Sequence, residues 1–203
     1  MSELTETPSR SEIERSVIEI VARSLERPVS AVHLNSRFWG DLDAESLDML
    51  DIVYAIEKRF RIRMPRLNLL TRAIALFGEE KIVERGVVTE TGLALMRLSM
   101  PEVPPDWITP GMRMYDFRRL ISVESFVRVV ERCIASVGNV RCDTCGGPTR
   151  MANPPEMALQ CELCHRILDL PSGEQLLVDD LKRSAQQLNL AIIEASAPAE
   201  IDV

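Results

Sequence analysis

The chain has 203 residues, of which 46% are hydrophobic, with a formal net charge of −7 and an isoelectric point near 5.0. This length fits one large domain or two small ones, and the apolar content is that of a globular protein with a buried core. The acidic balance argues against a nucleic acid held mainly through phosphate contacts, and it is compatible with a basic protein partner.

The N-terminal stretch does not predict a secretory signal. Residues 1–16 are polar, carry four glutamates and have no apolar core. The most apolar stretch, residues 67–77, is short and contains Arg72, so we expect no segment to span a bilayer. A cytoplasmic protein is the default expectation, with residues 1–10 as a disordered lead.

Residues 11–26 predict a first amphipathic helix. Its apolar side chains recur with helical spacing at Ile13, Val17, Ile20, Val21 and Leu25. Ser11 is the expected N-cap, and Glu14 three residues later would complete a capping box. A loop follows over residues 27–45, and His33 in it is interpreted as an ordinary loop residue.

A second helix is predicted from Ser46 to about Arg61, and Pro65 lies just beyond its end. At about 100° per residue, one side carries the expected core stripe of Met49, Ile52, Val53, Ile56 and Phe60. The opposite side carries an apolar row beside two acids: Leu47, Leu50 and Tyr54, with Asp48 and Asp51. Such a row indicates either a binding surface or a helix buried on two sides by the rest of the chain.

Ser46 stands at the head of this helix. A helix N-terminus has free N–H groups and the positive end of the helix dipole, so it accommodates a phosphodiester even among acidic neighbours. A plain serine N-cap explains the position as well. The residue pattern alone leaves both interpretations open.

The next stretch is less regular. Residues 67–86 suggest a helix, and residues 87–100 suggest a turn followed by a helix. Residues 101–111 contain four prolines and predict a loop.

Two further amphipathic helices are predicted in the C-terminal half. The first covers residues 122–138, with Ser122 or its neighbour as the cap and Gly138 as the stop. Cys133 lies on its apolar side and is expected to be a core thiol. The second covers residues 174–195, and a loose tail is expected after it.

Four of the five cysteines form two Cys-x-x-Cys pairs separated by fifteen residues: Cys142, Cys145, Cys161 and Cys164. At this spacing two tight turns present four thiolates to one ion, and a reducing compartment favours a metal over disulfides. The pattern resembles a zinc ribbon and predicts structural Zn2+. A rubredoxin-like iron site and a redox dithiol pair are the alternatives.

Because thiolates fill all four positions, the site is predicted to be closed and not catalytic. Gly146 and Gly147 follow the first pair, where a tight turn benefits from glycine. His165 follows Cys164 and is expected to lie outside the ligand set. The segment has few basic and aromatic residues, so nucleic-acid binding is poorly supported. A staple for a small domain, or a protein-docking surface, is the better interpretation.

Residues 36–65 resemble the acyl carrier proteins of fatty-acid and polyketide synthesis. The resemblance is carried by Asp41-Leu42-Asp43-Ala44-Glu45-Ser46-Leu47, by the acidic helix that follows, and by Phe60-Arg61-Ile62-Arg63-Met64-Pro65. With the helices on either side it extends over roughly residues 11–65 and 113–137.

The resemblance implies that Ser46 carries 4′-phosphopantetheine, transferred from coenzyme A by a phosphopantetheinyl transferase. The thiol of the arm would hold acyl groups as thioesters for acyl-loading and acyl-processing enzymes of ketosynthase or acyltransferase type. The pathway would make a lipid, a polyketide or a secondary metabolite. The face recognised by partners would comprise Glu45, Leu47, Asp48, Leu50, Asp51 and Tyr54. Such a protein is a carrier, not an enzyme.

Three positions depart from the family pattern. Glu45 replaces the usual aspartate. Asp43 replaces a glycine that often adopts a turn conformation, which aspartate tolerates better than most residues. A basic run from Lys58 to Arg66 replaces acids, so this end of the helix should recognise something different.

We therefore expect a mainly α protein. An acyl-carrier-like four-helix bundle would comprise residues 11–65 and 113–138, with a helical insertion at 66–112. A zinc-ribbon β module would follow at 139–173, and a C-terminal helix and tail at 174–203. The alternative is a non-catalytic interaction or regulatory protein, in which Ser46 is unmodified and the ribbon binds protein or nucleic acid. A redox protein is a third, weaker possibility.

Overall fold

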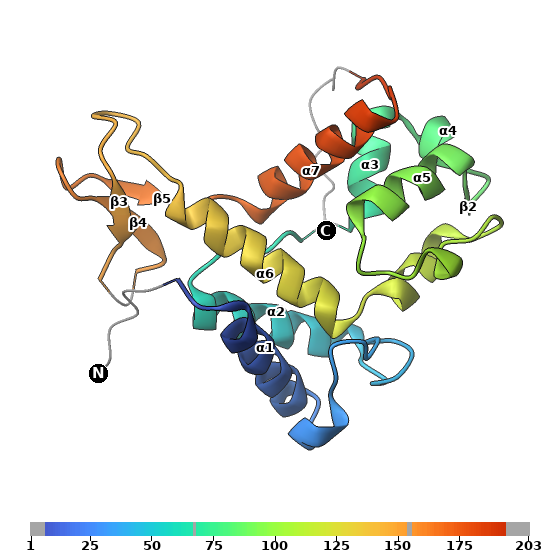
Figure 1. The fold of residues 1–203 in the computed structure, drawn as a ribbon, viewed down its shortest axis with the longest axis horizontal. Helices are drawn as coiled ribbons and strands as arrows, with labels where there is room; N and C mark the ends of the chain where they lie inside the picture. The colour runs from blue at the N-terminus through green and yellow to red at the C-terminus, as the bar shows by residue number, and fades with distance from the viewer. Residues whose placement is uncertain (1–6, 67, 154–155, 194–203) are drawn as a thin grey trace. The chain divides into compact units, whose positions relative to one another are not determined.

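The computed structural model describes residues 7–66, 68–153 and 156–193 (Figure 1). Its contacts divide the chain into two compact units, Met1–Arg66 with Ile121–Leu176 and Leu67–Leu120 with Leu177–Val203. In the described ranges no helix has the length and apolar content needed to cross a membrane. The expected tail and most of the expected disordered lead lie outside the described residues.

Three α-helices pack together in the first unit: α1 (Arg10–Ser24), α2 (Ser46–Phe60) and α6 (Val123–Gly138). Helix α1 lies beside both of the others (Figure 1), and a short 3-10 helix, η1 (Val29–Ala31), follows it. Their inward faces form one core, with Val17, Val21, Ile52, Ile56, Val127 and Val130 fully buried. The expected four-helix bundle is not confirmed, because the described part of this unit holds these three helices and only the first turn of another.

The cap of α1 differs from the prediction. Ser9, not Ser11, is the N-cap, and its hydroxyl accepts the N–H of Glu12 while the Glu12 carboxylate accepts the N–H of Ser9. The Ser-x-x-Glu pattern occurs twice here, two residues apart, and the earlier copy is used. The helix thereby includes Arg10, which pairs with Glu124 and Glu131 of α6.

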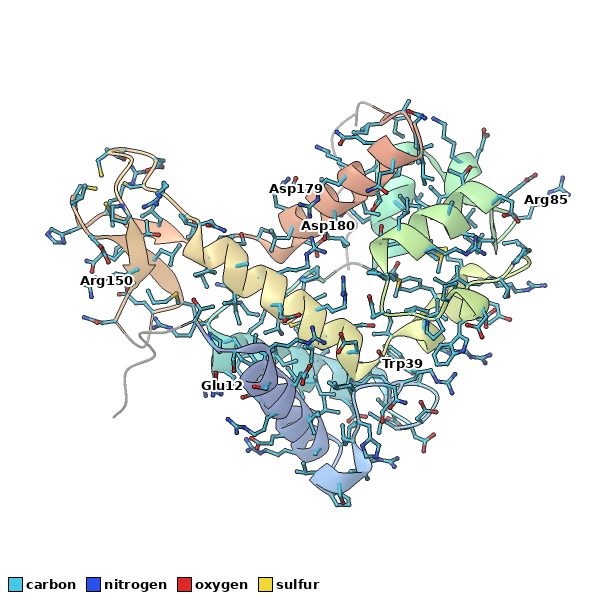
Figure 2. The ribbon with its side chains drawn as sticks, viewed as in Figure 1. Glu12, Trp39, Arg85, Arg150, Asp179 and Asp180 are labelled. Carbon is cyan, nitrogen blue, oxygen red and sulfur yellow. The ribbon has the colours of Figure 1, made fainter. Side chains whose placement is uncertain are left out.

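The second unit contains α3 (Leu69–Phe77), α4 (Glu79–Ile82), α5 (Glu90–Ser99) and most of α7 (Gly173–Gln187). Between α4 and α5, β1 (Val83–Glu84) and β2 (Val87–Val88) form an antiparallel hairpin, whose turn contains Arg85 (Figure 2). Two 3-10 helices follow α5, namely η2 (Pro105–Trp107) and η3 (Met114–Leu120).

Two helix predictions in this unit are corrected. The single helix expected over residues 67–86 is broken at Gly78, whose φ of +92° favours glycine, and the chain continues as α4 and the hairpin. Helix α7 ends at Gln187 instead of residue 195, because Asn189 adopts a left-handed conformation with φ +52°.

The two units also divide the chain differently from the expected domains. Residues 113–120, expected in the carrier-like domain, belong to the second unit. Most of the expected C-terminal segment belongs there too, because the unit includes residues 177–203. The expected insertion is therefore part of a larger compact unit.

A three-stranded antiparallel sheet belongs to the first unit. It consists of β3 (Thr149–Met151), β4 (Ala158–Cys161) and β5 (Ile167–Asp169), with β4 in the centre. The register pairs Arg150, labelled in Figure 2, with Gln160, and Gln160 in turn with Ile167. This sheet carries the second cysteine pair at the end of β4.

Buried polar groups fix the segment after α2. The Glu57 carboxylate is buried, and it accepts the N–H of Met64 at 2.9 Å and pairs with Arg66 at 2.7 Å. The Cys133 thiol lies 3.4 Å from the carbonyl oxygen of Arg63. Burial raises the pKa of Cys133 to about 12, which agrees with the expected core thiol.

Arg61 joins the end of α2 to the cysteine-bearing sheet of β3–β5, which is called the ribbon below. Its backbone is left-handed, with φ +54°, and this ends the helix. Its Nη2 donates to the carbonyl oxygens of Ala152 at 2.6 Å and Glu156 at 2.5 Å. These two residues lie between β3 and β4, so one guanidinium holds the ribbon to the helix that begins at Ser46.

We expect Arg61→Ala to loosen this connection. Charged hydrogen bonds contribute about 1.5–3 kcal/mol each when well shielded, so partly exposed ones should contribute less. Amide exchange at Ala152, whose N–H donates to the carbonyl of Ala158, should accelerate several-fold.

The matched control is Arg63→Ala, because Arg63 is exposed and its side chain makes no hydrogen bond or ion pair with a described residue. Equal exchange at Ala152 in both variants would show that Arg61 does not hold the ribbon.

Candidate functional site

Ser46 is exposed and is the first residue of α2. The cap position belongs to Glu45, whose backbone N–H donates to the Asp48 carboxylate at 2.7 Å. The Ser46 hydroxyl makes no hydrogen bond to a described residue. The interpretation of Ser46 as a plain N-cap is therefore wrong, and its oxygen is free to carry a substituent.

The loop before Ser46 is anchored in the core. Phe38, Leu42 and Ala44 are buried, and the N–H of Ala44 donates to the carbonyl of Phe38 at 2.9 Å. The Phe38 ring lies 4.8 Å from that of Phe126 on α6, and the neighbouring Trp39 is labelled in Figure 2. The loop therefore holds the start of α2 in a fixed position relative to α6.

A charged pair closes the same loop. The Asp41 carboxylate accepts the backbone N–H of Arg37 at 2.8 Å, its Nε at 3.1 Å and its Nη2 at 2.9 Å. Hydrogen bonds from Arg37 lower the pKa of Asp41 below its ordinary value. Asp43 has φ +52°, which confirms that this position needs a turn conformation, and it pairs with Arg27 at 3.2 Å.

The two sides of α2 are separated as predicted. Ile52 and Ile56 are fully buried, and the rest of the stripe, Met49, Val53 and Phe60, is partly buried against the same core. Leu47, Leu50 and Tyr54 are exposed by 72%, 60% and 65%. Glu45 and Asp51 are exposed beside them, and Asp48 is half-buried. The apolar row is thus an exposed face, not a second buried one.

The four paired cysteines converge. The sulfur atoms of Cys142, Cys145, Cys161 and Cys164 all lie within 4.8 Å of one another. The Sγ atoms of Cys142 and Cys164 are 3.6 Å apart, and those of Cys145 and Cys161 are 3.4 Å apart. A tetrahedral ion with Zn–S bonds of about 2.3 Å would place its sulfurs roughly 3.8 Å apart. The cluster therefore fits one such ion in a ribbon-like module.

The two cysteine turns have the same backbone geometry. The N–H of Cys142 donates to the carbonyl of Gly147, and the N–H of Cys161 donates likewise to that of Arg166. Gly146 and His165 hold matching places after the second cysteine of each pair, with φ of +70° and +60°. His165 is exposed and lies outside the cluster, as expected.

Backbone N–H groups in these turns favour thiolates. The N–H of Cys164 approaches the Cys161 sulfur at 3.5 Å. Such hydrogen bonds lower the pKa of Cys161 to about 6, and they also lower that of Cys142. The neighbouring cysteine side chains instead raise the pKa of Cys145 to about 12 and that of Cys164, so without a metal the protons stay on these two sulfurs. Ionised sulfurs are what a metal ion requires as ligands.

Several residues that position the site could not be recognised from the sequence. The Arg37–Asp41 pair is visible as opposite charges four residues apart, but nothing in the pattern placed it in this loop. Nothing in the sequence indicated that Arg61 contacts the cysteine module, because its carbonyl partners lie 91 and 95 residues away. His33 is an exposed loop residue, as predicted.

The chain is similar to curated acyl carrier proteins over part of its length. It is 43% identical over 53 residues to the acyl carrier protein of Rickettsia canadensis (strain McKiel), which is 26% of this chain and 62% of that protein. It is 44% identical over 43 residues to acyl carrier protein 3 of Ralstonia nicotianae (strain ATCC BAA-1114 / GMI1000), which is 21% of this chain and 49% of that protein.

The chain thus spans less than two thirds of the length of these relatives. No family model and no solved structure matches it.

The Arg37–Asp41 pair predicts a pH-dependent loss of stability on Asp41→Asn. Because the folded pKa of Asp41 lies below the ordinary value of 3.8, its contribution is present above that value and is lost as the pH falls through the folded pKa. The urea midpoint of the variant should be lower at neutral pH and should converge with that of the parent protein once the pH has fallen below the folded pKa of Asp41.

Asp51→Asn is the control, because Asp51 is exposed and its carboxylate makes no ion pair with a described residue. A gap between Asp41→Asn and the parent that is equally large in acid would contradict the assignment.

Proposed function

We propose that this protein is a specialised acyl carrier protein. It would hold acyl intermediates as thioesters on a 4′-phosphopantetheine arm attached to Ser46. The single observation that carries the proposal is an exposed serine, with a free hydroxyl, at the first position of a helix whose outer face is apolar and acidic. The partial similarity to acyl carrier proteins supports it.

The surroundings of Ser46 suit a phosphodiester. The first N–H groups of α2 have no partner within the helix, and the helix dipole adds partial positive charge. These groups offset the repulsion from Glu45 and Asp48. The anchored loop and the buried stripe of α2 hold the serine at the surface, so a transferase would meet a fixed target. The arm supplies a thiol for thioester formation, and this chain's residues position its attachment point.

The face around Ser46 would recognise partner enzymes. Its residues are Glu45, Leu47, Asp48, Leu50, Asp51 and Tyr54. Apolar contact would supply most of the affinity, and the carboxylates would steer basic patches of a phosphopantetheinyl transferase and of ketosynthase- or acyltransferase-type enzymes. The protein would serve a lipid, polyketide or secondary-metabolite pathway in the cytoplasm as a carrier without catalytic activity of its own.

The four cysteines would hold a structural Zn2+. The convergence of their sulfurs and the matched backbone turns support this proposal. With four thiolate ligands the site would be closed to substrate. Zinc would cross-link the two turns of a module that has little apolar core of its own, and Arg61 would tie that module to α2.

Incubation with coenzyme A and a broad-specificity phosphopantetheinyl transferase should add one phosphopantetheine to the protein. The intact mass before and after reaction measures this gain. Ser46→Ala should show none, while Ser36→Ala, at another loop serine, should be modified like the parent protein.

Failure of folded protein to gain mass with several transferases would sink the carrier proposal. It would favour the alternative of an interaction or regulatory protein in which Ser46 is unmodified.

Purified protein should contain one zinc ion per chain. Cys161→Ser should lose it, and amide exchange across β3–β5 should accelerate while the core of α1 and α6 stays protected. Cys133→Ala should retain the metal, because that thiol lies outside the cluster.

Metal analysis and native mass measurement distinguish the outcomes. Bound iron would identify a rubredoxin-like site, and a metal-free protein with Cys142–Cys164 or Cys145–Cys161 disulfides would favour the redox interpretation.

A further inference from the structure

The exposed row on α2 does not end at Tyr54. Leu47, Leu50 and Tyr54 are followed by Lys58, at successive spacings of three, four and four residues, so all four share one helix face. Asp51 lies on the same face, four residues after Leu47. All of these side chains are exposed. One continuous face therefore carries apolar side chains at Leu47, Leu50 and Tyr54, an acid between Leu50 and Tyr54, and a cation at its C-terminal end.

Among Lys58, Arg59 and Arg61 at the end of α2, Lys58 is the cation that can contact a partner bound to the exposed row. Arg59 points elsewhere, with its guanidinium carbon 5.5 Å from the centre of the Phe60 ring. Arg61 is engaged by the two ribbon carbonyls. Lys58 makes no ion pair or hydrogen bond with a described residue.

The helix dipole alone does not explain the position of Lys58. The dipole favours a cation anywhere in the last turns of a helix, and it does not require the cation to lie on the exposed face after Tyr54.

The two signs on the row are far enough apart to be recognised separately. Asp51 and Lys58 are seven residues apart, which is about 10 Å along a helix. At physiological salt the Debye length is about 8 Å, so neither charge cancels the other for a docked partner. A partner with a uniformly basic surface would meet attraction at Asp51 and repulsion at Lys58.

We propose that this row docks an amphipathic partner helix of mixed charge. The partner would present a basic side chain to Asp51, an apolar patch to Leu50 and Tyr54, and an acidic side chain to Lys58 about 10 Å further on. The inference rests on the proposed function, because it describes the partner of the face that bears Ser46. Lys58 thereby weakens the binding of enzymes whose docking surface is basic throughout.

Three synthetic helical peptides with the same apolar face test the charge pattern on the full-length protein. The first has a basic and an acidic residue two helical turns apart, the second has basic residues at both places, and the third has acidic residues at both. The mixed peptide can align in either direction, so its charges can always meet Asp51 and Lys58. Amide chemical shifts of Leu50, Tyr54 and Lys58 report weak as well as tight binding.

The parent protein should bind the mixed peptide at least about threefold more tightly than either uniform one, as the energies of exposed ion pairs suggest. Lys58→Glu should reverse the order and favour the uniformly basic peptide. Lys81→Glu, at an exposed lysine of α4 with the same charge change, should keep the parent's order.

A parent protein that prefers the uniformly basic peptide, that shows no preference, or that binds none of the peptides would overturn the inference. So would an unchanged order in Lys58→Glu.

Loading of Ser46 is measured on the same variants. Amide chemical shifts of the α1 and α6 core that match those of the parent protein show that Lys58→Glu is folded. Normal loading without the charge preference would refute this inference alone, whereas absent loading in every variant would refute the proposed function.

Discussion

The burial of one side of α2 determines which of its side chains are exposed at the candidate site. Ile52 and Ile56 are fully enclosed by α1 and α6, so the helix cannot rotate about its axis without exposing them. Fully burying such a side chain contributes about 1.5–3 kcal/mol. Because a helix has 3.6 residues per turn, the orientation that buries Ile52 and Ile56 points Leu47, Leu50 and Tyr54 outward. The exposed face is thus a geometric consequence of the buried one.

Both ends of α2 are fixed by contacts of the segments that adjoin the helix. At its start, a loop anchored by Phe38 and closed by the Arg37–Asp41 pair holds Ser46 at the surface. At its end, Arg61 reaches the ribbon and Glu57 holds the following segment. The cysteine module is therefore a support for the helix that carries the candidate attachment site, and not merely an appendage at the C-terminal end of α6.

Features set by local chemistry could be predicted from the sequence. The cysteine spacing indicated one tetrahedral cluster, and the structure brings those sulfurs together. Periodicity separated the two sides of α2, and Asp43 was expected at a turn position. The predictions that failed depended on competition between local options. Two Ser-x-x-Glu patterns compete for the cap of α1, and contact of Arg10 with α6 favours the first. Gly78 can continue a helix or end one, and here it ends α3.

The sequence by itself determined the position of Ser46 at a helix start, the apolar row beside it and the paired-cysteine pattern, because each depends on neighbours within a few residues. Only the tertiary structure decided that the Ser46 hydroxyl makes no hydrogen bond to a described residue. The fold likewise decided that Arg61 is engaged, whereas Lys58 makes no ion pair or hydrogen bond within the described part of the chain. It also decided that residues 67–120 join the C-terminal helix in a second unit. Those outcomes depend on partners many residues away, and chain folding alone brings such partners together.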